Sequence, residues 1–185
     1  MIRKFKFKLL SIAACLLMLS TNVVVGQAAS TIQDNYAKKI AIGLTSLNNI
    51  STLDFTVTDN YYIQENNIAL NKGSKYNITL SNSIFVLTQD GKQICSLDTV
   101  TICPNSATSY ISFKKDTWMR YFSGSLTFNK LTPNTFIPIN KLGIEDYVKG
   151  VVPYECSESY PIEALKVQAV SARTYALANL GRFSA

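Results

Sequence analysis

The sequence contains no histidine. Histidine is the side chain that most often serves as a general base near neutral pH, and it is the commonest metal ligand. Its absence excludes Ser-His-Asp and Cys-His catalytic groups and every metal site in this chain that would need an imidazole. Carboxylates are the acid and base groups that remain available. No metal site and no cofactor are expected.

Charged residues are also scarce, at 16% of the chain against 47% hydrophobic residues. This balance is typical of a globular domain and excludes disorder as the main state, and 185 residues allow one domain. The formal net charge is +6, but Arg3, Lys4, Lys6 and Lys8 supply four of the positive charges. The other 14 basic residues are scattered among 12 acidic ones. A dense basic face for nucleic acid is therefore not expected.

The first 28 residues have the pattern of a secretory signal peptide. A cationic start is followed by mostly apolar residues 9–25, and Gly26-Gln27-Ala28 supplies small residues for cleavage. An uncleaved membrane anchor through residues 9–25 stays open, because a stretch of this length can just about cross a bilayer. A lipoprotein anchor at Cys15 is disfavoured, since apolar residues follow it. The protein is therefore expected to be exported, to an extracytoplasmic or cell-wall location.

Three cysteines lie beyond this segment, at Cys95, Cys103 and Cys156. Cys95 and Cys103 lie in a stretch that reads as two short strands, so a local disulfide is feasible, and its formation stays open. Cys156 is interpreted as a small, half-buried apolar residue. A thiol nucleophile would need a base, and no histidine exists to serve.

From Lys38 to about Ile139 the chain has the alternating pattern of β-strands. Asp90-Gly91 predicts a tight hairpin turn, and Asn71-Lys72-Gly73 predicts a looser one. The sequence therefore predicts an antiparallel, half-exposed sheet region. The alternating segments are KKIAIGLTSL, TLDFTVTD, YYIQENNIAL, KYNITLS, SIFVLT, TSYISFKK and YFSGSLTFN.

After Asn140 the spacing becomes helical. The segment LGIEDYVKGVV predicts a short helix that Gly150 and Pro153 close. A second helix of about 20 residues, roughly 30 Å long, is predicted from Pro161 to the stop signal at Gly181. We expect this helix to pack into a core, because small residues on its apolar stripe allow another element to approach closely. The stripe consists of Ile162, Leu165, Ala169, Ala172, Ala176 and Leu180.

The expected fold class is α+β, with an antiparallel β-sheet region followed by a short helix, a functional loop and a long packed helix. The loop is residues 151–161, VVPYECSESYP. Glu155 follows a rigid Pro153 turn and stands between Tyr154 and Cys156, so it can be partly desolvated. Desolvation raises the pKa of a carboxylic acid toward the value that a proton donor needs. Taken alone, the residues favour an exposed loop glutamate, and a capping or salt-bridged role would also fit.

The run INKLGIEDYVKGVVPYE, followed at a short distance by EALKVQAVSARTYAL, resembles the signature of the stage II sporulation protein D family, also called the SpoIID/LytB domain. Upstream, KKIAIGLTS resembles the opening strand of that domain, and YFSGSLTF resembles the strand just ahead of the signature. The resemblance covers roughly residues 38–183. Because the signature is long and nearly contiguous, the match is specific, and residues 38–185 are interpreted as one domain of this type.

The resemblance implies peptidoglycan chemistry outside the membrane. Sporulation members of the family are lytic transglycosylases that act during engulfment on glycan strands freed of stem peptides. Their catalytic residue is the glutamate of the VVP.E signature, which matches Glu155. A single carboxyl group, acting as acid and then as base, can give a 1,6-anhydro-muramic product, so the second carboxylate of ordinary hydrolases is not required. Glu158 is interpreted as a solvated loop charge.

Substrate contacts are expected from Tyr154, Gln168 and Arg173, of which Gln168 and Arg173 match family positions. An arginine can hold a glycan oxygen or a neighbouring carboxylate in a bidentate grip. The alternative is that Arg173 anchors the loop to the helix, through Glu163 or the backbone. A direct pair with Glu155 would keep that glutamate ionised and oppose an acid role, so catalysis predicts that the two are separate.

An aromatic group stands beside one predicted strand, at Trp118, Tyr121 and Phe122. Such rings could stack on sugars. An aromatic run beside a strand is more often part of a core, and that interpretation is preferred here.

Family members continue past the ARTYAL helix with a stretch that completes the domain and lines the glycan groove, and in some members supplies metal ligands. The resemblance therefore implies a domain that is incomplete, or truncated, at its C-terminus. Three interpretations stay open: a lytic transglycosylase, a non-catalytic wall-binding modifier of an amidase, and an inactive truncated remnant. The expected partners are peptidoglycan glycan strands and other sporulation cell-wall hydrolases or an amidase.

Overall fold

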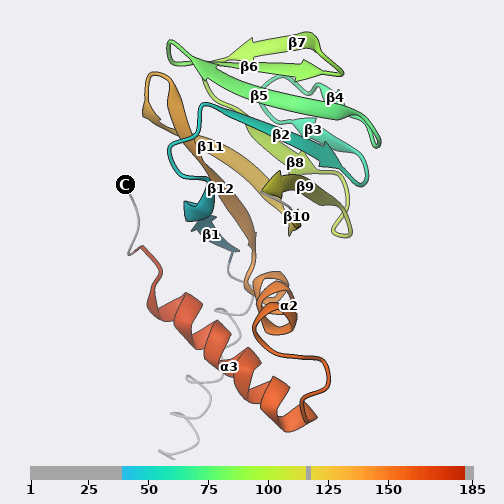
Figure 1. Ribbon diagram of the computed structural model, residues 1–185, viewed down its shortest axis with the longest axis vertical. Helices are drawn as coiled ribbons and strands as arrows, with labels where there is room; N and C mark the ends of the chain where they lie inside the picture. The colour runs from blue at the N-terminus through green and yellow to red at the C-terminus, as the bar shows by residue number, and fades with distance from the viewer. Residues whose placement is uncertain (1–38, 116–117, 182–185) are drawn as a thin grey trace, which may run out of the picture. The chain divides into compact units, whose positions relative to one another are not determined.

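The computed structural model describes residues 39–115 and 118–181 of the chain. The predicted signal peptide, residues 1–28, lies outside the described residues and stays a prediction. The described part contains two antiparallel sheets and two α-helices (Figure 1), which confirms the predicted α+β class. None of the described helices is both long enough and apolar enough to cross a membrane.

The strands form two six-stranded sheets, named sheet A and sheet B here, and neighbouring described strands in each are antiparallel. In spatial order, sheet A consists of β1 (Lys39–Gly43), β12 (Thr135–Gly143), β11 (Ser125–Thr132), β8 (Thr101–Pro104), β3 (Tyr61–Ile63) and β4 (Ala69–Leu70). Sheet B consists of β10 (Trp118–Ser123), β9 (Tyr110–Lys115), β2 (Thr52–Val57), β5 (Lys75–Ser81), β6 (Ile84–Gln89) and β7 (Lys92–Leu97). A short 3-10 helix, η1 (Thr45–Leu47), follows β1.

Burial alternates along the strands, as the predicted half-exposed sheet requires. In β5 the side chains of Tyr76, Ile78 and Leu80 are buried, while the intervening polar residues are half-buried and the strand ends are exposed. Successive side chains of a strand point to opposite faces, so each strand offers one apolar face to a core. The two sheets bury these faces against each other.

Three phenylalanines join the sheets across this core. The ring centroid of Phe85 on β6 lies 6.0 Å from that of Phe128 on β11 and 5.5 Å from that of Phe136 on β12. Phe128 and Phe136 meet edge to face at 5.6 Å. Tilted and edge-to-face rings at such distances add to the stability that their burial provides.

The two predicted turns have different outcomes. Asp90 and Gly91 have φ values of 49° and 81°, and Gln89 pairs with Lys92, so the predicted tight hairpin between β6 and β7 is confirmed. The turn at residues 71–73 exists, with Gly73 at φ 86°, but it is not a hairpin. It leads from β4 in sheet A to β5 in sheet B, so the chain changes sheet there.

The segment YFSGSLTFN is two strands rather than one, because the backbone turns at Gly124. This residue has φ 78°, and a Cβ atom there would lie 2.3 Å from the carbonyl oxygen of Lys141. The buried Asn140 side chain holds both flanks, since its Nδ2 donates to the carbonyl oxygens of Ser123 at 2.8 Å and Ser125 at 3.1 Å. The chain therefore passes from sheet B to sheet A at this glycine.

The helices α2 (Ile144–Glu155) and α3 (Ile162–Ala178) follow β12, and α2 continues directly from that strand (Figure 1). Ile144 is fully buried beside Ile40 and Leu142, and Ala176 and Leu177 of α3 pack against this small cluster.

The prediction that α3 packs into a core is wrong for most of its length. Ala172 is the one buried residue among its described side chains, whereas Ile162 is 63% exposed and Leu180, two residues past the end of the helix, is also exposed. Leu165, Ala169 and Ala176 are half-buried. The apolar stripe therefore contacts its neighbours only through its middle.

Cys95 on β7 and Cys103 on β8 are free thiols in different sheets, so the feasible disulfide is not formed.

Phe122 is half-buried, and its ring stacks on that of Phe113 with the ring centroids 4.7 Å apart, as expected of a core residue. Tyr121 is 62% exposed, so the core interpretation is wrong for that residue. The Trp118 side chain lies outside the described residues.

Candidate functional site

Glu155 lies on a helix and not in the expected loop. The prediction that Gly150 and Pro153 close the helix is wrong, because α2 continues through Pro153 to Glu155. The amide of Cys156 donates to the carbonyl oxygen of Val152 at 2.9 Å, which keeps helical bonding past the proline. Proline removes a single N–H from the ladder, and the bond from Cys156 shows that helical bonding resumes after it.

A short exposed turn links the helices. The amide of Tyr160 donates to the carbonyl oxygen of Ser157 at 3.1 Å, and the hydroxyls of Ser157 and Ser159 share a 2.8 Å hydrogen bond. Pro161 is the N-cap of α3, and the amide of Ala164 donates to its carbonyl oxygen at 2.9 Å. Because the turn is short, α2 and α3 lie in contact with each other.

The structure brings two of the predicted site residues together. Gln168 on α3 donates a hydrogen bond from Nε2 to Oε2 of Glu155, although 13 residues separate them in the sequence. Glu155 is exposed and Gln168 is half-buried. The amide group therefore fixes the carboxylate at the end of α2 from the facing helix.

Arg173, the third predicted site residue on these helices, is held elsewhere. Its Nε and Nη2 donate to the two carboxylate oxygens of Glu145 at 2.8 and 2.7 Å, and its side chain is 18% exposed. These hydrogen bonds are the main reason that the pKa of Glu145 is lowered. The predicted bidentate grip on a neighbouring carboxylate is thus observed, with Glu145 as the partner. The suggested partner Glu163 instead pairs with Lys166 at 2.8 Å.

Tyr154, the predicted substrate contact, is 72% exposed on α2. The guanidinium of Arg120 on β10 lies over its ring, 5.0 Å from the centroid, and Nη2 donates to the phenol oxygen at 3.3 Å. This contact joins the last turn of α2 to the edge of sheet B. Part of the ring face is therefore already covered by a cation.

Tyr147 belongs to the same site, and sequence reasoning assigned it no role there. Burial raises the pKa of its phenol, and the negative charge of Glu155 and the nearby Tyr175 raise it further. The sequence spacing could have indicated this, because residues 147 and 155 are two helical turns apart and lie on one side of a helix. It could be used only once α2 was known to continue to Glu155.

Glu155 is exposed, so the partial desolvation expected of its carboxylate is not observed. Two cavities of the described part lie over the sheets, and Glu155 lines neither of them. Glu158 is exposed, as predicted for a solvated loop charge, and Cys156 is a half-buried free thiol, also as predicted.

The comparisons with known proteins match the helical end of the chain. The family model described as Stage II sporulation protein, SpoIID, matches residues 133–184. An uncharacterized protein of Brachyspira hyodysenteriae is 57% identical over 56 residues, which is 30% of this chain and 15% of that relative. No solved structure matches the chain. The matched residues contain β12, α2 and α3, together with Glu145, Glu155, Gln168 and Arg173. Through this segment the chain is similar to the SpoIID family.

Proposed function

We propose that the protein is a peptidoglycan lytic transglycosylase of sporulation, with Glu155 as acid and then base. A protonated Glu155 gives its proton to the glycosidic oxygen that leaves the muramic acid. The resulting carboxylate takes the proton of the sugar's own 6-hydroxyl, whose oxygen bonds to the anomeric carbon and closes the 1,6-anhydro ring. Atoms and charge balance without water, so one carboxyl group is sufficient.

The observation that carries the proposal is the hydrogen bond from Gln168 to Glu155. Gln168 is neutral, and its amide carries both donor and acceptor atoms. The NH₂ group can donate to the carboxylate, and after a half-turn the carbonyl oxygen can accept from the carboxylic acid. A residue that must alternate between acid and base therefore keeps its partner in both states.

The position of Arg173 also supports an acid–base role for Glu155. A guanidinium only donates hydrogen bonds and would hold Glu155 ionised. Glu145 binds Arg173 through both carboxylate oxygens, so that guanidinium already has a carboxylate partner. Within the described residues no salt bridge joins Glu155 to a cation. Glu155 and Arg173 are thus separate, as acid catalysis predicts.

Under this proposal the substrate is the glycan strand, on the outer side of the membrane. Tyr154, beside Glu155 on α2, can offer a sugar the part of its ring that Arg120 leaves uncovered, and Gln168 orients the acid. No cofactor is needed for the two proton transfers, because the nucleophile and the leaving group both belong to the substrate.

The test compares Glu155→Gln with Glu158→Gln, a matched loss of charge three residues away in the exposed turn. Purified peptide-free glycan strands are the substrate, and mass spectrometry measures release of 1,6-anhydro-muramic products. Glu155→Gln should lower the rate by about 10²-fold or more, the usual contribution of a positioned acid–base group, and Glu158→Gln should leave it unchanged. Unchanged release by Glu155→Gln refutes the proposal.

A second function is favoured by the exposure of Glu155 and of the tyrosines around it. Tyr154, Tyr160 and Tyr175 are all exposed on or between the two helices, and Glu155 lines neither of the two cavities described above. Exposed aromatic rings suit adhesion to sugar surfaces. We therefore propose, as the alternative, a non-catalytic wall-binding modifier of an amidase. In that case the Glu155→Gln variant still sediments with cell walls and still stimulates the amidase. The wild-type protein then releases no 1,6-anhydro product.

A further inference from the structure

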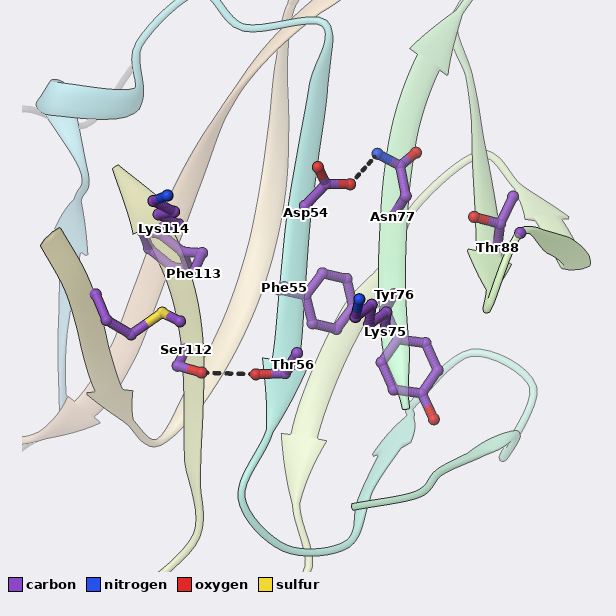
Figure 2. Close-up of a pocket in the computed structure, with 12 residues that line it drawn as sticks. Asp54, Phe55, Thr56, Lys75, Tyr76, Asn77, Thr88, Ser112, Phe113 and Lys114 are labelled. Carbon is purple, nitrogen blue, oxygen red and sulfur yellow. Dashed lines mark hydrogen bonds between the residues drawn. The ribbon is translucent and has the colours of Figure 1, made fainter. Parts of the chain in front are cut away.

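A second candidate binding surface lies on sheet B, far in sequence from the residues that the family model matches. A cavity of about 510 Å³ lies over the strands β9, β2 and β5 (Figure 2). That volume is within the usual range for sites that hold small ligands. The face is the outer one, because Phe55 and Tyr76 of the same strands are buried in the core. Its polar lining includes Asp54, Thr56, Lys75, Asn77, Ser112 and Lys114.

Hydrogen bonds between strands fix these polar side chains in place. Nδ2 of Asn77 donates to Oδ1 of Asp54 at 2.7 Å, and the hydroxyls of Thr56 and Ser112 share a hydrogen bond at 2.8 Å (Figure 2). Thr79 in turn donates to Oδ1 of Asn77 at 2.8 Å. Groups that are ordered before binding lose less conformational entropy when a ligand arrives. The face therefore offers a preorganised row of hydroxyl, amide and carboxylate groups.

The lining of the cavity carries more positive than negative charge. Lys75 and Lys114 are both exposed, and neither takes part in a salt bridge with a described residue. Asp54 is the one carboxylate in the lining, and it already accepts from Asn77. Two ammonium groups beside one carboxylate favour a ligand that carries negative charge.

An aromatic ring stands at the margin of the cavity. Tyr121 on β10 pairs in register with Ser112, which lines the cavity, and its side chain is exposed. Met119, two residues earlier on the same face of β10, also lines the cavity. A flat ring and a thioether beside hydroxyl and amide groups suit the apolar face and the polar edge of a sugar.

We propose that this face of sheet B binds an acidic saccharide chain, with its carboxylates at Lys75 and Lys114 and a sugar ring on Tyr121. An apolar ligand would take water from the ammonium groups of Lys75 and Lys114 without offering them a charged partner. A polyphosphate would place its charges against Asp54. The proposal goes beyond the transglycosylase reaction, since none of these residues belongs to the helix pair that contains Glu155. The face would hold a strand whether or not the protein cleaves it.

The test measures binding with the whole chain carrying Glu155→Gln, so that cleavage does not interfere. The probes are peptide-free glycan strands, whose muramic residues carry carboxylates, a neutral N-acetylglucosamine hexamer, and polyphosphate. Lys75→Gln with Lys114→Gln should weaken binding of the strands about tenfold, because two solvent-exposed ion pairs together contribute about as much as one shielded charge-assisted hydrogen bond. Lys72→Gln removes the same charge from an exposed turn outside the cavity lining and should change nothing.

Backbone amide shifts locate the site independently of affinity. Titration with the strands should shift amides of β2, β5 and β9, and the neutral hexamer should bind more weakly than the strands. The proposal is overturned if the paired lysine variant binds the strands as wild type does, if the hexamer binds equally well, or if polyphosphate binds more tightly. Matching thermal unfolding of the lysine variants shows that they are folded.

Discussion

The bridge between Arg173 and Glu145 should hold α3 against the start of α2. The two helices share little buried surface, since Ala172 is the one buried side chain among the described residues of α3. The bridge closes with two hydrogen bonds of 2.8 and 2.7 Å in a bidentate geometry. We expect Glu145→Gln to loosen α3 from α2 without disturbing the sheets.

The size of the effect follows from the exposure of the two groups. Hydrogen bonds to charged groups contribute about 1.5 to 3 kcal/mol when shielded, whereas exposed ion pairs contribute about 0 to 1 kcal/mol. The Arg173 side chain is 18% exposed and that of Glu145 is 44% exposed, so solvent screens the pair substantially. We therefore expect Glu145→Gln to cost about 1 kcal/mol. Opening of α3 should then become about fivefold more frequent.

The pH dependence provides a second check. The hydrogen bonds from Arg173 lower the pKa of Glu145 in the folded protein. The bridge therefore contributes its full stability above the ordinary glutamate pKa of about 4.3, and this contribution is lost as the pH falls through the lower folded-state value. The difference between wild type and Glu145→Gln should be constant at neutral pH and should vanish in strong acid.

Amide hydrogen exchange along α3 is the appropriate assay, because it reports local opening. Asp146→Asn is the matched control, since Asp146 lies in the same first helical turn but pairs with the exposed Lys149 at 3.0 Å. Both variants lose one favourable charge at the start of α2, so their difference isolates the Arg173 bridge. Equal exchange in the two variants, or a difference that persists at low pH, would refute the reasoning.

Two further predictions concern the sheets, with urea denaturation as the measurement. Gly124→Ala should destabilise by about 2 kcal/mol or more, because it combines φ 78° with a 2.3 Å approach to the Lys141 carbonyl oxygen. Gly150→Ala meets open space within α2 and should show no loss, so a loss in both variants would contradict this account. Phe85→Ala should cost about 3 to 5 kcal/mol, since Phe85 is fully buried against two rings of sheet A, and a cost below 1 kcal/mol would show that the sheets do not depend on it.

Part of the candidate site could be predicted from the chain alone. Glu155, Gln168, Arg173 and Tyr154 were identified by their motif, and all four lie on or beside the two predicted helices. Their pairing could not be predicted, because it depends on the crossing of α2 and α3. Helical spacing shows which residues share a face of one helix, but not which residue of the second helix faces them.

The end of α2 shows how a local rule can fail. Proline is a strong signal for the end of a helix, and Pro153 was interpreted in that way. In the last turn the same residue loses only one hydrogen bond, and the bond from Cys156 to Val152 keeps the helix intact. This places Glu155 on a rigid element, with Tyr147 two turns earlier on the same face.

The sequence by itself determined the local elements of this protein, because alternation, helical spacing and turn chemistry act between residues that are close along the chain. Most of the strands, the Asp90-Gly91 hairpin and the two helices follow from such patterns, whereas β8 and β12 are absent from the predicted segments. Only the tertiary structure decided that the strands divide into two sheets, that Cys95 and Cys103 lie in different ones, and that Arg173 pairs with Glu145. An alternating strand specifies which face is buried but not which strand covers it, and that choice is made by packing between residues far apart in the sequence.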